Sequence, residues 1–186
     1  MRRRPTFFVL LLLTLALTGS CARKPPANVR RPSSVLASQT LTGRVVRIAD
    51  GDTITLLDAA NTQHRIRLQG IDAPESRQAF GVQSKQNLSI LIFDKNVTAT
   101  CDKTDQYGRL VCKIVVDGKD INLEQVKAGM AWHYKEYENE QSPEDRELYG
   151  RAEDEARNAR RGLWADANPI EPGEFRREEQ REREGR

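Results

Sequence analysis

The sequence predicts an α+β fold that is mainly β, a small five-stranded barrel with three helices. Two observations predict it. Five short segments have the β-branched composition, or the alternation of apolar and polar residues, that is typical of strands. One helical segment lies between the third and the fourth of these strands, and two more helical segments follow the fifth.

The first three expected strands form a meander. Residues 42–48 are rich in Val and Ile, and Asp50-Gly51-Asp52 then marks a turn. Residues 53–57 alternate in polarity, and residues 64–70 do so again after a break. Each of these segments therefore has one face that can be buried in a barrel.

The remaining elements complete the order of the fold. The apolar residues of 83–93 recur at helical spacing, and residues 97–101 and 110–116 are expected to be strands. A short helix begins near Asn122. A longer one begins after Ser142, because Ser is a good N-cap and the Pro that follows it fits the first helical position. Five strands with a helix after the third have the order of an OB-type barrel.

Residues 1–21 have the pattern of an export signal. Three arginines precede an apolar run of eleven residues, Phe7 to Leu17, which is too short to cross a bilayer core of about 30 Å as a helix. Gly19-Ser20-Cys21 follows and resembles the lipobox of bacterial lipoproteins, in which the Cys is lipidated. The alternative is a secretory signal that is cleaved nearby. Either pattern predicts an exported protein, held in the bacterial cell envelope or secreted.

Two segments are expected to lie outside the folded domain, which is expected over residues 41–165. Residues 22–40 are rich in Pro and in basic residues and predict a flexible tether. Residues 166–186 mix Arg and Glu with almost nothing to bury, which predicts a charged tail that is disordered or forms a frayed helix.

The net charge excludes a domain that coats nucleic acid through bulk charge. The whole chain has 30 Lys and Arg against 27 Asp and Glu, and residues 41–165 have 18 against 20, a net charge of −2. A domain that coats nucleic acid should be basic. Any chemistry on phosphate must therefore use a few placed cations.

Four motifs supply the groups that hydrolysis of a phosphodiester needs, which are carboxylates and guanidinium groups. Each motif alone has an ordinary explanation as a turn, a strand face or a cap. The motifs are Asp50-Gly51-Asp52-Thr53, Arg65-Ile66-Arg67-Leu68, Ile71-Asp72-Ala73-Pro74-Glu75 and Asp105-Gln106-Tyr107-Gly108-Arg109.

Taken in order, these motifs resemble the thermonuclease family, whose members contain staphylococcal-nuclease-like domains. The resemblance extends from about Leu41 to about Ala165 and includes Gly43-Arg44-Val45-Val46 and Arg161-Gly162-Leu163-Trp164. It implies an OB-type five-stranded barrel with three helices, in a monomer. It also implies calcium-dependent hydrolysis of DNA and RNA that leaves a 3′-phosphate.

The resemblance implies a metal site and three of its ligands. Asp52 and Asp72 match the carboxylates that bind Ca²⁺, and the carbonyl oxygen of Ala73 matches the third protein ligand. Calcium is a hard cation that takes 6–8 oxygen ligands, so this set leaves room for water and for a phosphate oxygen.

The resemblance also implies the groups that act on the substrate. Glu75 matches the residue that orients or deprotonates the attacking water, and Arg67 and Arg109 match two phosphate-binding arginines. Arginine suits this role because its planar fork binds two phosphate oxygens and stays charged. Tyr107, next to the second arginine motif, matches a residue that contacts the substrate.

Two other classes of function fit parts of the sequence. One is a catalytically weak, nucleic-acid-binding OB-type module of the cell envelope, which should have lost several of the matched catalytic side chains; all five are present. The other is an envelope tethering protein whose function lies in residues 166–186.

Cys101 and Cys112 lie on two strands that are expected to pair, at matching distances from the centre of their connection. Export implies an oxidising compartment, where a cross-strand disulfide can form. Two buried free thiols fit the same placement.

We expect Cys21 to be acylated and to hold the protein on the outer face of a bacterial membrane. A Cys21→Ser variant should then be released from the membrane fraction or stall during export. Mass spectrometry and cell fractionation test this. Wild-type protein that is wholly soluble in the medium and carries no lipid would contradict the anchor and leave simple secretion.

Overall fold

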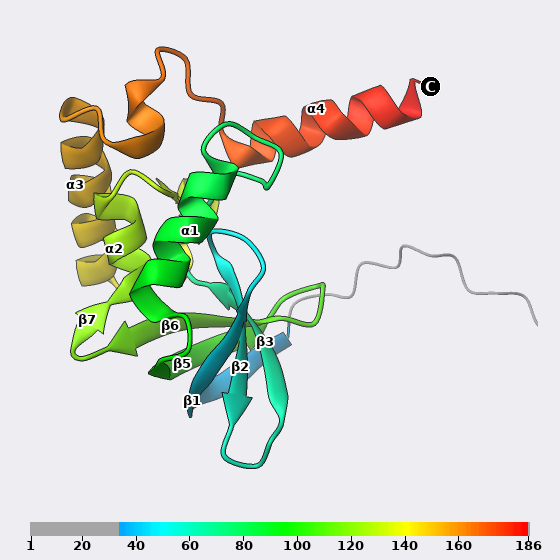
Figure 1. Ribbon diagram of the computed structural model, residues 1–186, viewed down its shortest axis with the longest axis vertical. Helices are drawn as coiled ribbons and strands as arrows, with labels where there is room; N and C mark the ends of the chain where they lie inside the picture. Colours follow the sequence, from blue (N-terminus) through cyan, green and yellow to red (C-terminus); the bar gives the residue numbers. More distant parts are fainter. Residues whose placement is uncertain (1–33, 186) are drawn as a thin grey trace, which may run out of the picture.

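The computed structural model describes residues 34–185, and they form a closed barrel with helices at one end (Figure 1). The sheet order is β3-β2-β1-β5-β6, and a parallel pairing of β3 with β6 closes it. The OB-type fold predicted from the sequence is therefore confirmed. The barrel strands are β1 (Ser34–Ile48), β2 (Thr53–Asp58), β3 (Gln63–Leu68), β5 (Asn96–Thr104) and β6 (Leu110–Val116).

The alternation in the strands places their apolar residues inside the barrel. Ile54 and Leu56 of β2, and Ile66 and Leu68 of β3, are almost completely buried. Each such side chain contributes roughly 2 kcal/mol by leaving water. The barrel is thus a packed core that can hold loops at its end in fixed positions.

Three helices pack at that end: α1 (Gly81–Ile92), α2 (Ile121–Lys127) and α3 (Pro143–Asn158). Leu88 and Ile92 of α1 are fully buried against the barrel core. The predicted start of α3 is confirmed, because the Ser142 side chain accepts a hydrogen bond from the backbone N–H of Asp145 at 3.1 Å. Two 3-10 helices, η1 (Lys135–Glu140) and η2 (Gly162–Ala165), flank α3.

Three two-residue strands complete the sheets: β4 (Ile71–Asp72), β7 (Lys119–Asp120) and β8 (Trp132–His133). β7 pairs with β6, and β4 pairs with β8 in a separate small sheet. In that sheet Asp72 lies opposite Trp132. This pairing fixes the backbone that follows β3 at the end of the barrel.

The tether predicted over residues 22–40 ends earlier in the structure, because its last residues belong to β1. β1 begins at Ser34, and Gln39 and Thr40 pair with Cys101 and Thr100 of β5. The strand extends because β5 is itself longer than expected and offers free backbone hydrogen-bonding groups to pair. The export signal, Cys21 and the tether up to residue 33 lie outside the described residues.

Of the two alternatives for residues 166–186, the disordered tail is wrong for most of the segment, and the helical one agrees with the structure. A fourth helix, α4, spans Pro172–Glu184 and extends away from the barrel (Figure 1). Pro172 is buried in the first helical turn, and Arg183 pairs with Glu179 one turn earlier. The disordered alternative failed because local tertiary contacts and pairs at i and i+4 stabilise a helix that has almost no apolar face. No helix within residues 34–185 combines the length and the apolar character that a membrane span needs.

Cys101 and Cys112 form a disulfide between β5 and β6, which resolves the two alternatives left by the sequence. They are direct partners in the strand pairing, and both are fully buried. The two cysteines are 11 residues apart in the sequence, so the disulfide closes a short loop that contains the β5–β6 turn.

We expect removal of this disulfide by a Cys101→Ser/Cys112→Ser double variant to lower the free energy of unfolding by about 3 kcal/mol, because the unfolded chain loses a loop constraint. Urea denaturation of the oxidised protein and the variant measures the difference. Equal stabilities, or free thiols in the purified wild-type protein, would contradict the result.

Candidate active site

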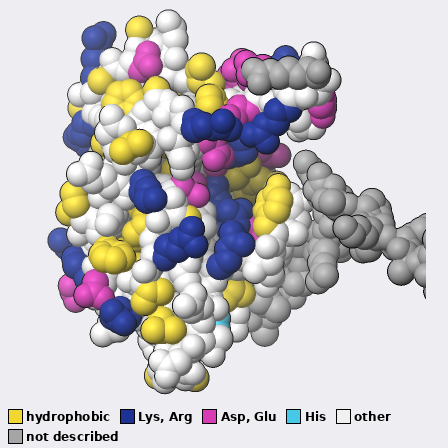
Figure 2. Space-filling model, turned by 45° about the vertical axis from the view of Figure 1, so that its right-hand side comes forward, with side chains coloured by type: hydrophobic (Ala, Val, Ile, Leu, Met, Phe, Trp, Pro, Cys, Tyr) yellow, Lys and Arg dark blue, Asp and Glu magenta, His cyan; other side chains and the backbone are white. Residues whose placement is uncertain are grey.

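A cleft of about 420 Å³ lies at the end of the barrel and brings together all the site residues predicted from the sequence. Lys and Arg side chains gather around a hollow in this face of the molecule (Figure 2). The predicted residues that line the cleft are Asp52, Arg67, Asp72, Ala73, Glu75, Tyr107 and Arg109.

Asp52 is held by the tight turn between β1 and β2. Its backbone N–H donates to the Asp50 side chain at 3.1 Å, so the turn is closed by an acidic side chain. Gly51 is necessary at the centre, because a Cβ atom there would collide with the Ser84 side chain and with Ala73. The Asp52 carboxylate is consequently buried, with 6% of the residue exposed.

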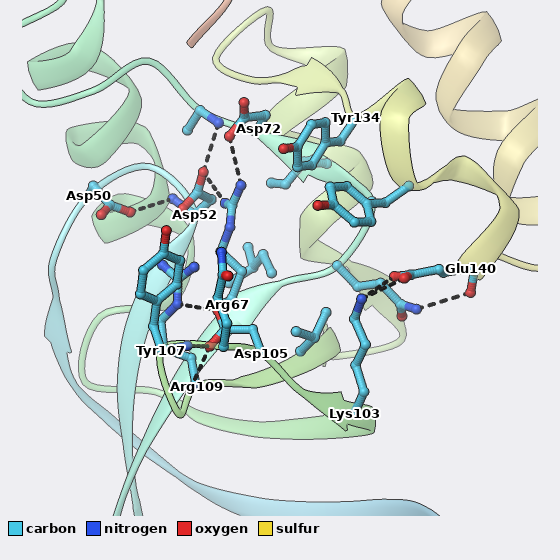
Figure 3. A pocket seen from close by; sticks show the side chains of 18 of the residues that line it. Asp50, Asp52, Arg67, Asp72, Lys103, Asp105, Tyr107, Arg109, Tyr134 and Glu140 are labelled. Atoms are coloured by element: carbon cyan, nitrogen blue, oxygen red, sulfur yellow. Dashed lines mark hydrogen bonds and ion pairs between the residues drawn. The ribbon is translucent and has the colours of Figure 1, made fainter. Parts of the chain in front are cut away.

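Arg67, near the end of β3, lies between the carboxylates of Asp52 and Asp72 (Figure 3). Its Nη1 contacts Asp52 Oδ2, and its Nη2 donates to Asp72 Oδ1 at 2.7 Å. The guanidinium is nearly buried, with 12% of the side chain exposed. The Arg67 guanidinium therefore joins two acidic residues that come from different segments, the β1–β2 turn and β4.

The environment of Asp52 stabilises its ionised form. Burial opposes ionisation, but the charge of Arg67 and a hydrogen bond from the Ala73 N–H outweigh it and hold the pKa of Asp52 below its ordinary value. That hydrogen bond, from Ala73 N to Asp52 Oδ2, is 2.7 Å long. It also fastens the segment after β4 to the turn before β2.

Arg109 and Tyr107 come from the turn between β5 and β6. Asp105 organises this turn, since it accepts from the backbone N–H groups of both residues at 2.9 Å. The Nε of Arg109 donates to Asp105 Oδ2 at 2.7 Å, and its Nη1 donates to the Thr53 hydroxyl at 3.3 Å. Tyr107 is 63% exposed beside the guanidinium, whose central carbon lies 5.3 Å from the ring centre. Both side chains thus lie at the mouth of the cleft.

Glu75 follows the small strand β4 and is half-exposed at the edge of the cleft. Its Oε1 accepts a hydrogen bond from Nη1 of Arg176, in α4, at 2.9 Å. The same Arg176 contacts both carboxylate oxygens of Asp72, at 3.2 and 3.0 Å. A residue of the predicted charged tail therefore belongs to the cleft.

The cleft is lined by six carboxylates but only four cationic side chains, those of Arg67, Lys103, Arg109 and Arg176. Burial, with the nearby charge of Asp52 second, raises the pKa of Asp50 to about 7. Burial also raises the pKa of Asp72, and the charge of Asp52 contributes in the same direction. A cation added to such a cluster is stabilised by this charge.

The donor set fits a hard cation such as Ca²⁺. Asp52 and Asp72 supply carboxylate oxygens on one side of the cleft, and oxygen ligands are what calcium binds. Within residues 34–185 no three His, Cys, Asp or Glu side chains form a ready metal cluster. The third protein ligand that the resemblance implies is of another kind, the main-chain oxygen of Ala73.

The sequence did not reveal several residues that shape the site. Gln125 donates to the carbonyl oxygens of Gly51 and Ser84, at 2.7 and 3.2 Å, and so fixes the Asp52 turn to α1 and α2. In the sequence Gln125 is only one polar residue of a short helix, with no pattern that indicates this contact. Tyr134 and Tyr137 line the opposite wall, and their rings are 4.9 Å apart.

A barrel whose end carries a buried carboxylate pair and arginines has the groups that hydrolysis of a phosphodiester needs. Comparisons with known proteins agree with that reaction. The family described as "Staphylococcal nuclease homologue" matches residues 65–166. The chain belongs to this family, and it is a nuclease.

Relatives over most of the chain carry related names. An "Uncharacterized endonuclease" of Haemophilus influenzae is 39% identical over 179 residues, which cover 96% of this chain and 89% of the relative. A "Micrococcal nuclease" of Shigella flexneri is 42% identical over 153 residues, 77% of this chain and 85% of the relative. A "Probable staphylococcal-like nuclease" of Oryza sativa is 40% identical, covering 66% of this chain and 32% of the relative.

We expect a Gln125→Ala variant to lower the free energy of unfolding by about 2–4 kcal/mol, because two buried carbonyl oxygens lose their donor. Glu124→Ala is the matched control, since that neighbour makes only a surface pair with Lys127 and should cost less than about 1 kcal/mol. Urea denaturation measures both. Equal losses for the two variants would show that Gln125 does not hold the Asp52 turn.

Proposed function

We propose that the protein is a calcium-dependent nuclease that hydrolyses DNA and RNA outside the cytoplasm and leaves 3′-phosphate ends. The observation that carries the proposal is the convergence of five side chains in one cleft. Two are the buried carboxylates of Asp52 and Asp72, and three are the groups suited to phosphate chemistry, Glu75, Arg67 and Arg109.

The two arginines are suited to bind the scissile phosphate. Arg67 lies within the carboxylate pair, and Arg109 lies on the other side of the Asp52 turn, linked to it through Thr53. Both guanidinium groups are held by ion pairs, so they cost little reorganisation when charge develops on the phosphate. As the phosphorus is attacked its oxygens become more negative, and these donors bind the transition state more strongly than the substrate.

Glu75 is suited to accept a proton from the attacking water. It is the most exposed of the three carboxylates predicted to act in the site, so water can reach it. Attack on phosphorus with loss of the 5′-oxygen would leave the phosphate on the 3′ side. Asp52, Asp72 and the Ala73 carbonyl would hold Ca²⁺, which when bound polarises a phosphoryl oxygen and offsets repulsion between carboxylate and phosphate.

The proposed location rests on the sequence and on the disulfide. An oxidising compartment favours the Cys101–Cys112 bond, and the first 21 residues have the pattern of an export signal. We place a monomer in the cell envelope through a lipidated Cys21, or in the medium. Its substrates there would be extracellular DNA and RNA.

The proposal is tested by cleavage of single-stranded and duplex DNA, and of RNA, in calcium and in EGTA. We expect activity only with calcium, and product ends that carry a 3′-phosphate. Arg67→Lys keeps the charge but loses the two-pronged donor, so kcat should fall by about 10²–10³-fold. Arg65→Lys is the matched control, because Arg65 lies on the same strand but does not line the cleft.

Full activity in EGTA would contradict the calcium requirement. Undiminished cleavage by Arg67→Lys would contradict the role given to that residue. Loss of activity in Arg65→Lys to the same extent would show that the effect is on folding, which urea denaturation of both variants would reveal.

A further inference from the structure

The C-terminal helix places one arginine in the cleft. Arg176 lies one turn after the start of α4, 101 residues from Glu75 in sequence, yet it lines the same cleft as the proposed catalytic groups. It is absent from the predicted site because nothing in the charged tail distinguishes it from the other arginines there. Its contacts distinguish it in the structure.

Arg176 contacts both oxygens of Asp72, including the one that Arg67 leaves free. Arg67 donates to Asp72 Oδ1, which also accepts from Nη1 of Arg176 at 3.2 Å, whereas Nη2 of Arg176 donates to Asp72 Oδ2 at 3.0 Å. Nη1 of Arg176 reaches Glu75 Oε1 at 2.9 Å. One guanidinium thus bridges the proposed base and a carboxylate to which the proposed cation would also bind.

Several contacts hold the start of α4 against the segment that carries Glu75. The Gln78 side chain donates to the carbonyl oxygen of Ile170 at 2.6 Å, and Arg77 pairs with Glu179 at 2.6 Å. Ile170 and Phe175 line a small groove that also involves Phe80. These contacts position Arg176 without using the carboxylates, so α4 can stay near the cleft when the bridge opens.

We infer that Arg176 is a positioning residue that competes with the catalytic cation for Asp72. Its guanidinium holds the carboxylates of Asp72 and Glu75 together. A cation on Asp72 would compete for that carboxylate and so free Glu75 to face water. This inference rests on the proposed function, because it assigns the cation and the base as that proposal does.

Such competition has a reciprocal consequence. If Arg176 weakens cation binding by a given factor, cation binding weakens the Arg176 contacts by the same factor. Calcium should therefore loosen the first turns of α4. A purely structural ion pair on the surface would not respond to calcium in this way.

The test measures calcium binding by isothermal titration calorimetry with CaCl₂, on the purified protein. Arg176→Gln should lower the calcium Kd by on the order of tenfold, within the usual range of coupling between sites. Arg176→Lys, which keeps the positive charge, should recover most of the wild-type Kd. Arg177→Gln is the matched control, because it removes the same charge from the next, exposed position of α4 and should leave the Kd unchanged.

Hydrogen exchange gives a second measurement. Calcium should speed exchange of the α4 amides in the wild-type protein and have no such effect in Arg176→Gln. If the wild-type protein cleaves DNA with calcium but the Arg176→Gln variant has an unchanged or higher calcium Kd, this inference alone is overturned. A wild-type protein that binds no calcium would overturn the proposed function as well.

Discussion

The contact of Arg67 with Asp52 and Asp72 is the interaction on which the site depends. Two carboxylates buried at this depth would be strongly disfavoured without a cation between them, and removing one member of such a group costs about 3–5 kcal/mol. The bridge also ties together three segments, the β1–β2 turn, the end of β3 and the small strand β4. The geometry of the cleft and the stability of this end of the barrel therefore share one cause.

A barrel suits this arrangement because it brings distant turns to one end of a rigid core. The strands bury their apolar residues and fix where each turn emerges, and the turns then need only short polar contacts to align their side chains. Asp105 aligns Arg109, Asp50 closes the turn that carries Asp52, and Gln125 fastens that turn to the helices. The positions of the side chains in the cleft are thus fixed by hydrogen bonds within the turns and between the turns and the helices.

The sequence predicted the barrel from a local signal, and the site residues from the resemblance of its ordered motifs to a known family. Strand alternation has a period of two residues, and the acidic and basic residues of the site fall in short motifs next to turns. The sequence could not predict the extension of β1 to Ser34, the ordering of α4 or the place of Arg176, because these depend on pairing with β5 and on contacts with Arg77, Gln78 and Glu75. Composition describes only the segment itself, whereas the start of β1 and α4 are ordered by contacts with other parts of the chain.

Charge placement explains how residues 41–165, with a net charge of −2, can act on a polyanion. Bulk positive charge would bind the substrate and the transition state about equally and so would not raise kcat. In the proposed mechanism, guanidinium groups whose charge is already offset by buried carboxylates would add little to substrate binding and would act where new negative charge appears. The same acidic residues that cancel the net charge would hold the cation. A nuclease of this type therefore needs its acidic residues as much as its arginines.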